Sequence, residues 1–231
     1  MIKLGTNNLS LQGIEKAYLG SDLVYQKANY APYSCKALYH CDYNLTDETG
    51  INNATGTYNE QLGKFNMGTR LNGIRFYFPL ISADDLKTKS YTLEFWCRKV
   101  NSTDKGFLIT LGNTNSSANS FIASNDYVTN GMKPSTSYSS GSSTIIYKPD
   151  SFDCTIYHHL AIVFHLGTIY CFIDGKLSTT TPVATNLTKD LDSLSNNWQV
   201  SSNDVDEVMF CEEAKYLADF TPPTRPYTLR T

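Results

Sequence analysis

Residues 157–177 read YHHLAIVFHLGTIYCFIDGKL and predict three consecutive antiparallel strands. Two apolar runs, Leu160–Phe164 and Ile169–Ile173, are separated by a short segment in which Gly167 permits a tight reversal of the chain. The second run is followed by Asp174-Gly175, a pair typical of two-residue hairpin turns because both residues tolerate a positive φ. Both faces of the second run are apolar. We therefore expect that strand to be covered on both sides, as in the core of a β-sandwich.

Composition and charge exclude several classes of protein. The 231 residues contain 19 Lys and Arg against 22 Asp and Glu, so the net charge is −3. A protein that coats nucleic acid would carry a basic stripe, which this balance does not supply. The chain has no run of about 18 apolar residues for a membrane span. Its beginning, MIKLGTNNLS, does not resemble a signal peptide, so we expect it to be the mature N-terminus.

The cysteines are expected to be reduced thiols. None belongs to a C-x-x-C pair, and none has a His or a second Cys at the spacing of zinc ligands. Several lie in apolar, strand-like segments, where cysteine acts as a small hydrophobic residue. The even number leaves a disulfide framework as the alternative, but the sequence indicates no export route. The six are Cys35, Cys41, Cys97, Cys154, Cys171 and Cys211.

The opening stretch resembles a segment of laminin-G-like (concanavalin A-like) jelly rolls that reads approximately WHHVAVV…G.LYLFVDG, with Tyr157 where the family usually has Trp. Residues 91–98, YTLEFWCR, are similar to the family's FTIEFWVR, and residues 61–78 are similar to its S-KFG-S-L-F piece. The resemblance implies an all-β fold, an antiparallel two-sheet jelly-roll sandwich. It also implies that Glu94 is a residue of the sheet rather than a catalytic carboxylate. Only short helices are expected, near Ala83–Leu86 and Glu212–Leu217.

Three further segments resemble proteins of tailed-phage virions. The sequence ALYHCDYNLTDETG from Ala37 is similar to LLHFDG…TDSSG of phage-type jelly rolls, and Asp204–Thr228 is similar to their ending, approximately IDEVRISKGVARYTANFTPPTAPF. Near the N-terminus, IKLG and YLGSDLVYQK resemble the virion segment YLGS-x-x-V-(Y/W). The matches occur in the correct order and span roughly residues 37 to 228.

We expect three parts: an N-terminal virion-anchoring β module at 1–28, a linker at 29–36, and the laminin-G-like jelly roll at 37–231. The first part contains two strand–turn–strand units, Lys3–Leu9 and Tyr18–Val24. It is too short to hold a core of its own, so it should dock on a partner. The alternative is a strand pair of the main sheet. The residues assigned to anchoring are Leu4, Leu9, Tyr18, Leu23 and Tyr25.

The sequence predicts no catalytic residues. Endoglucanases of the superfamily carry a pattern like E-x-D-x-x-E, and a retaining pair needs carboxyl groups about 5 Å apart. The nearest candidate, the run 204–207 (DVDE), lacks that pattern, and neighbouring carboxylates in a strand are expected to point to opposite faces. The same argument separates His158 from His159, which we interpret as structural. Phosphate loops, nucleophile elbows and Cys–His dyads are not recognised.

Residues 113–143 are rich in Ser, Thr, Asn and Gly, as in a disordered linker, but FIASNDYV and STIIY keep strand-like apolar positions. We therefore expect edge strands joined by long exposed loops. Sugar sites combine aromatic faces with amide, carboxylate and hydroxyl groups. The alternative is that such residues are ordinary solvated loop residues. The candidate ligand-binding residues are Asn113, Asn125, Asp126, Tyr127 and Tyr138.

The resemblance also bears on metals, because laminin-G-like domains often hold one Ca²⁺ at the loop rim. A calcium site needs about six to eight oxygen ligands, and the spacing of Asp and Asn does not assemble that number. No cofactor and no metal site are therefore predicted, with Ca²⁺ as the alternative.

These interpretations predict a non-enzymatic bacteriophage structural protein, a head or tail fibre or capsid decoration protein. It would be located in the virion after assembly in the bacterial host cytoplasm, and its jelly roll would bind a host-surface or mucus glycan. Its partners would be other virion proteins, through residues 1–28, and further copies of itself, but neither nucleic acid nor a membrane. The alternatives are a purely structural decoration protein without a ligand, and a virion-borne glycanase.

Overall fold

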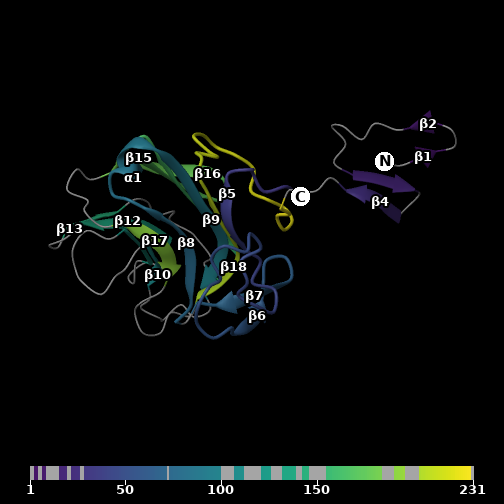
Figure 1. Ribbon diagram of the computed structural model, residues 1–231, viewed down its shortest axis with the longest axis horizontal. Coiled ribbons are helices and arrows are strands. Elements are labelled where there is room, and N and C mark those ends of the chain that lie inside the picture. Colours follow the sequence, from purple (N-terminus) through teal and green to yellow (C-terminus); the bar gives the residue numbers. More distant parts are fainter. Residues whose placement is uncertain are drawn as a thin grey trace.

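The structure is a computed structural model (Figure 1) in which nearly all regular elements are strands. It describes residues 3–4, 7–8, 16–19, 22–26, 29–71, 73–99, 107–111, 121–125, 132–138, 142–145, 155–183, 190–195 and 203–229. Side chains are described for 29–71, 73–98, 155–178, 180, 183, 190–194 and 203–229.

An eight-stranded and a six-stranded sheet lie face to face and form a sandwich (Figure 1). Every pairing between the strands of these sheets is antiparallel. The larger sheet has the order β16-β15-β14-β9-β18-β7-β6, and β5 also pairs with β18. Its strands are β5 (Cys35–Tyr39), β6 (Glu60–Leu62), β7 (Met67–Arg70), β9 (Ser90–Lys99), β14 (His158–His165), β15 (Thr168–Ile173), β16 (Lys176–Pro182) and β18 (Asn203–Cys211).

The six-stranded sheet has the order β13-β12-β11-β10-β17-β8. Its strands are β8 (Arg75–Ile81), β10 (Phe107–Leu111), β11 (Phe121–Asn125), β12 (Met132–Tyr138), β13 (Ser142–Ile145) and β17 (Leu191–Ser195). Strands are thus present within residues 113–143, as predicted. They are β11, β12 and the start of β13, at one edge of this sheet. The one helix of the described residues, α1 (Asp85–Thr88), begins two residues after the predicted start.

The two predicted reversals are confirmed. Asp174 and Gly175 have φ values of 49° and 75° between β15 and β16, and Leu166 and Gly167 have φ values of 46° and 82° between β14 and β15. Two consecutive positive φ values are what two-residue hairpin turns require. Local chemistry therefore positions three neighbouring strands at one edge of the larger sheet.

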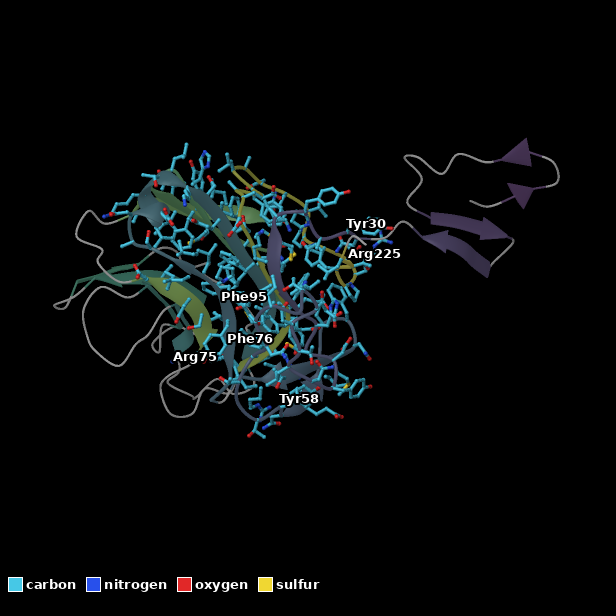
Figure 2. All side chains as sticks on the ribbon, viewed as in Figure 1. Tyr30, Tyr58, Arg75, Phe76, Phe95 and Arg225 are labelled. Carbon is cyan, nitrogen blue, oxygen red and sulfur yellow. The ribbon has the colours of Figure 1, made fainter. Side chains whose placement is uncertain are left out.

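The main core lies between the inner faces of the two sheets. Phe76 of β8 and Phe95 of β9 are fully buried there (Figure 2), and Phe78 stacks on Phe210 with ring centroids 4.6 Å apart. In β15, the alternate residues Ile169, Cys171 and Ile173 belong to this core. Neighbouring residues of β15 face outward, where Phe172 is covered by a second cluster. The predicted two-sided burial of this strand is confirmed.

The C-terminal segment, residues 212–229, crosses the outer face of the larger sheet. Tyr216 and Phe220 stack at 3.5 Å and pack over Phe172. The predicted helix near Glu212–Leu217 is wrong. Thr92 of β9 accepts a hydrogen bond from the backbone N–H of Lys215 at 3.0 Å and donates one to the carbonyl of Glu213 at 2.7 Å, so these backbone groups bond to the sheet instead of to a helical turn.

Residues 1–28 contribute two separate two-stranded sheets, β1 (Lys3–Leu4) with β2 (Asn7–Asn8) and β3 (Lys16–Leu19) with β4 (Asp22–Gln26). Of the anchoring candidates, Leu4, Tyr18, Leu23 and Tyr25 lie in these strands without described side chains, and Leu9 lies outside the described residues. The anchoring role stays a prediction.

The expected linker at 29–36 is bonded to the C-terminal segment. The backbone N–H of Ala31 donates to Thr228 at 2.9 Å, and Asn29 accepts from the N–H of Thr228 at 2.9 Å. Figure 2 shows Tyr30 beside Arg225 at this junction, and the Asn29 side chain donates to the Arg225 carbonyl at 3.0 Å. The last two residues of the expected linker, Cys35 and Lys36, already belong to β5.

Candidate functional site

The outer face of the larger sheet carries a line of polar side chains from β9. Strand alternation sends Leu93, Phe95 and Cys97 into the core, as predicted from YTLEFWCR. The intervening Glu94, Trp96 and Arg98 therefore lie on the outer face, where β18 aligns Asp204 with Arg98 and Asp206 with Trp96. Two polar clusters result, one buried beneath the C-terminal segment and one half-exposed.

In the buried cluster, Glu94 is 0% exposed and accepts hydrogen bonds from the Lys215 ammonium and, at 2.6 Å, from the Tyr227 hydroxyl. Lys215 also donates to the Tyr227 oxygen at 2.9 Å. His159 Nε2 lies 3.5 Å from Glu94 Oε2, while His159 Nδ1 has no hydrogen-bond partner among the described residues.

The charges of the buried cluster follow from this geometry. Burial alone would raise the pKa of Glu94, but the Lys215 charge and the hydrogen bonds from Lys215 and Tyr227 together outweigh burial and hold the pKa below the usual value. Burial lowers the pKa of His159 to about 4, so the imidazole is neutral at pH 7. The cluster is thus one Glu94–Lys215 ion pair with two neutral neighbours. Because the C-terminal segment covers it, a substrate cannot reach Glu94 or His159, which supports the structural interpretation of both residues.

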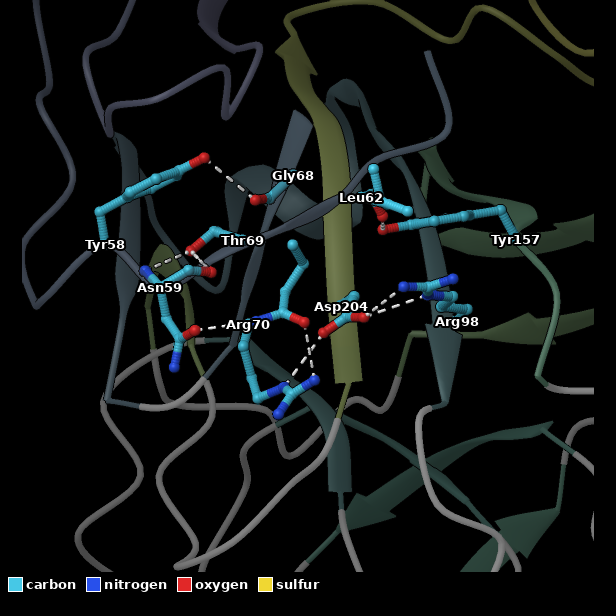
Figure 3. A network of polar contacts seen from close by, with 10 residues as sticks. Tyr58, Asn59, Leu62, Gly68, Thr69, Arg70, Arg98, Tyr157 and Asp204 are labelled. Atoms are coloured by element: carbon cyan, nitrogen blue, oxygen red, sulfur yellow. Dashed lines mark hydrogen bonds and ion pairs between the residues drawn. The ribbon is translucent and has the colours of Figure 1, made fainter. Parts of the chain in front are cut away.

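The half-exposed cluster is built around Asp204, whose side chain is 0% exposed (Figure 3). Arg70 Nε of β7 donates to one carboxylate oxygen at 3.2 Å, and Arg98 donates to the other through Nε and Nη2, both at 3.0 Å. The side chains of both arginines are 29% exposed. Two guanidinium groups share one carboxylate, so the cluster carries one net positive charge.

Aromatic and amide groups surround the two arginines. The Tyr157 ring lies 5.0 Å from the Arg98 guanidinium, and its hydroxyl donates to the Leu62 carbonyl at 2.8 Å (Figure 3). Gln61 Oε1 accepts from Arg70 Nη2 at 2.9 Å. A guanidinium has five N–H groups, and the contacts to Asp204 and Gln61 engage two from each arginine. We call this set the arginine surface; it consists of Gln61, Arg70, Arg98 and Tyr157.

A β-bulge at Asp206–Glu207 alters the expectation that neighbouring carboxylates of β18 point to opposite faces of the sheet. Glu207 has a φ of 53°, and β18 changes partner here from β7 to β5. The expected alternation of neighbouring carboxylates fails, because the bulge adds one residue between the core positions Val205 and Val208. Burial and the Glu207 charge raise the pKa of Asp206 to about 7.

Both bulge carboxylates are engaged with the backbone. Asp206 Oδ2 accepts from the backbone N–H groups of Lys64 and Phe65 at 2.7 and 3.1 Å, and Glu207 Oε2 accepts from the N–H of Tyr227 at 3.0 Å. Both residues are at most 2% exposed. Their role is to hold the β6–β7 turn and the C-terminal segment on the sheet.

The predicted ligand residues fall mostly outside the described part of the chain. Asn113, Asp126 and Tyr127 lie outside the described residues, and only the backbone is described for Asn125 and Tyr138. Asn125 ends β11 opposite Met132, the first residue of β12, whereas Tyr138 is the last residue of β12. Six residues of strand span roughly 20 Å, so the two backbone positions lie far apart along β12. The assignment of these residues to a ligand site stays a prediction.

The arginine surface was missed by sequence reasoning. The alternation of YTLEFWCR indicates the outward face of Arg98, but nothing local to the sequence brings Arg70 to the other side of Asp204. Within the residues whose side chains are described, no group of three or more His, Cys, Asp or Glu side chains is arranged to hold a metal ion. The described residues also contain no helix that is long and apolar enough to cross a membrane.

The comparisons with known proteins agree with this fold. The model of the concanavalin A-like lectin/glucanases superfamily matches residues 76–210. The comparison with curated protein sequences gave no match.

Several solved structures are similar. Domain 4 of AbnA, a GH43 extracellular arabinanase from Geobacillus stearothermophilus solved with arabinotriose, is 18% identical; the match covers 78% of this chain and 93% of that one, with a TM-score of 0.52. Trypanosoma rangeli sialidase is 12% identical, with 80% and 32% coverage and a TM-score of 0.59. A structure of botulinum neurotoxin type C, whose cell entry depends upon interaction with two ganglioside molecules, is 14% identical, with 79% and 49% coverage and a TM-score of 0.53. This chain thus spans about a third of the sialidase and half of the toxin chain, and at these identities the likeness shows the fold.

Proposed function

Because the chain belongs to the concanavalin A-like lectin/glucanases superfamily, we propose that it is a carbohydrate-binding protein of a bacteriophage virion and has no catalytic activity. The observation that carries the proposal is the arginine surface. It offers planar polar groups held in place by a buried carboxylate, with the Tyr157 ring beside Arg98. Such groups bind sugar hydroxyls and sugar-ring faces.

The support for binding rather than hydrolysis comes from the carboxylates. A retaining glycosidase needs two accessible carboxyl groups about 5 Å apart. Among the carboxylates on the outer face, Glu94 is covered by the C-terminal segment and paired with Lys215. Asp204 is occupied by two arginines, and Asp206 binds backbone N–H groups. Glu94, Asp204, Asp206 and Glu207 are all at most 2% exposed, so a substrate cannot reach any of these carboxyl groups.

The virion location is supported by the two phage-like segments. The ending with Phe220-Thr221-Pro222-Pro223 resembles phage-type jelly rolls, and residues 1–28 resemble the attachment segment of virion proteins. The described part of those residues consists of two-stranded sheets. Isolated hairpins are at best marginally stable in water, so a docking partner would stabilise them. The similar domains of an arabinanase and of a ganglioside-dependent toxin are consistent with a glycan as the ligand.

The proposal is tested with the full chain on a glycan array, followed by an assay for released reducing sugar on each glycan that binds. We expect saturable binding of at least one glycan and no release of sugar. A blank array would instead favour a purely structural decoration protein, and released sugar would identify a virion-borne glycanase. Either of these results would overturn the proposal.

A further inference from the structure

Two cysteines face each other across neighbouring strands. Cys35 is the first residue of β5 and Cys211 is the last residue of β18, and the two are paired in the register directly after a bulge between Phe210 and Cys211. The backbone N–H of Glu212 donates to the Ser34 carbonyl at 3.0 Å. Hydrogen-bonded and non-hydrogen-bonded pairs alternate along an antiparallel ladder, so the cysteines occupy a non-hydrogen-bonded pair.

This position suits a covalent bond between the two sulfurs. In a non-hydrogen-bonded pair the Cα atoms are about 4.5 Å apart and the side chains approach each other. Disulfides form at Cα separations of about 4.4–6.8 Å, so the pairing brings the two cysteines within reach of a bond. The two thiols are close enough for each to shift the pKa of the other.

We propose that Cys35 and Cys211 are an oxidisable pair that forms a disulfide between β5 and β18 by exchange with a low-molecular-weight disulfide such as oxidised glutathione. The burial of the two residues assigns their roles in that exchange. Cys35 is half-buried and can meet a small molecule, whereas Cys211 is buried behind it. Cys35 is therefore the attacking thiol and Cys211 the resolving thiol.

The surroundings of Cys35 favour its thiolate. The hydrogen bond from the Cys211 thiol lowers the pKa of Cys35, and the charge of Lys215 acts in the same direction. Burial opposes this effect at Cys35, and at Cys41 and Cys171 burial raises the pKa above the ordinary value. Because the thiolate is the nucleophile, Cys35 is the more reactive of these thiols.

The exchange balances in two steps. The Cys35 thiolate attacks one sulfur of the small disulfide, which forms a mixed disulfide and expels one small thiolate. Cys211 then gives up its proton, and its sulfur attacks the Cys35 sulfur and expels the second small thiolate. The two protein thiols lose two electrons and two protons in total, and the small disulfide is reduced to two thiols.

The bond would join β5, the first strand of the sandwich, to β18, the strand that directly precedes the C-terminal segment. Cys35 and Cys211 pack in one apolar cluster with Leu38, Met209 and Tyr227. Residues between 35 and 211 include most of the fold, and cross-links that close long loops stabilise a protein by restricting its unfolded chain. Oxidation should therefore raise the melting temperature.

The test uses the full chain, freed of reductant and then treated with oxidised glutathione. Before treatment, alkylation under denaturing conditions should find six reactive thiols. After treatment, the intact mass should fall by two hydrogen atoms, four thiols should remain reactive, and peptide mapping should link Cys35 to Cys211. The melting temperature should rise and return to its original value on reduction.

Three variants assign the roles. Cys211→Ser should stop at the mixed disulfide and gain one glutathionyl group on Cys35. Cys35→Ser should gain neither a cross-link nor a rapid adduct, and the core control Cys171→Ala should cross-link as the unmodified chain does. Six thiols that stay reactive in the unmodified chain, a glutathionyl adduct on Cys35 that never resolves, or a cross-link between other cysteines would each overturn the proposal.

Discussion

Glu94 and Lys215 show how single residues on the outer face hold the C-terminal segment in place. The carboxylate is fully buried and the Lys215 side chain is only 12% exposed, so each charge depends on the other. The lowered pKa of Glu94 means that its ionised form stabilises the folded state. That contribution is present above the unfolded pKa of the carboxyl group and is lost as the pH falls through the folded value.

We predict that Lys215→Met destabilises the protein by about 3–5 kcal/mol at pH 7, because it leaves a buried carboxylate without its partner. The difference in unfolding free energy between this variant and the unmodified chain should become smaller toward pH 4, where Glu94 can take up a proton. The double variant Glu94→Gln with Lys215→Met should recover part of the stability. Urea unfolding of the three proteins at pH 7 and pH 4 measures this, and an equal loss at both pH values would contradict it.

Asp206 is predicted to behave in the opposite way. Burial and Glu207 raise its folded pKa to about 7, so its contribution to stability is present at low pH and is lost as the pH rises through 7. Asp206→Asn keeps an oxygen for the N–H groups of Lys64 and Phe65 without the charge. Relative to the unmodified chain, the variant should gain a few kcal/mol in unfolding free energy between pH 4 and pH 8. A difference that does not change with pH would refute the shifted pKa.

At the scale of elements, prediction succeeded where the determining chemistry is local. Asp174-Gly175 and Gly167 reverse the chain by their own conformational freedom, and the alternation of YTLEFWCR places Arg98 outward. Prediction failed where distant partners compete. The Thr92 hydroxyl forms hydrogen bonds with the backbone of Glu213 and Lys215, and these groups are then not free to form the expected helix. The bulge at Glu207 arises where β18 exchanges one neighbouring strand for another, which no local pattern indicates.

The contact between Gly175 and the C-terminal segment is an element-scale prediction with a matched control. A Cβ at Gly175 would lie 2.0 Å from the Phe220 carbonyl oxygen, whereas nothing lies within 4 Å of a Cβ at Gly50. Both glycines have a φ of 75°, so Gly50→Ala measures only the conformational strain, about 1–2 kcal/mol. Gly175→Ala should cost more and should expose the Tyr216–Phe220 stack to limited proteolysis. Equal losses in thermal unfolding would show that the segment is not held there.

At the scale of the whole molecule, residues 1–28 and the sandwich are expected to be independent in stability. Where the first part is described, it consists of two-stranded sheets, whereas the sandwich has its own core. The virion docking assigned to residues 1–28 depends on partners outside this chain. The sequence could therefore suggest that role only by resemblance.

Deletion of residues 1–28 should leave a soluble domain with nearly the same melting temperature, because none of the core residues is removed. The truncated protein should lose self-association, which light scattering after size exclusion measures for both forms. Unfolding or aggregation of the truncated protein would show instead that these strands belong to the sandwich.

The central claim is that the arginine surface binds the glycan, and a titration with a glycan identified on the array tests it most directly. Arg98→Lys keeps the positive charge beside Asp204 but removes the planar set of N–H donors. Arg75→Lys makes the same change on β8 of the other sheet, outside the arginine surface. Isothermal titration should show that Arg98→Lys weakens binding about tenfold or more, the value of one hydrogen bond to a charged group, and that Arg75→Lys leaves the affinity unchanged. Equal affinities for the two variants would contradict the claim.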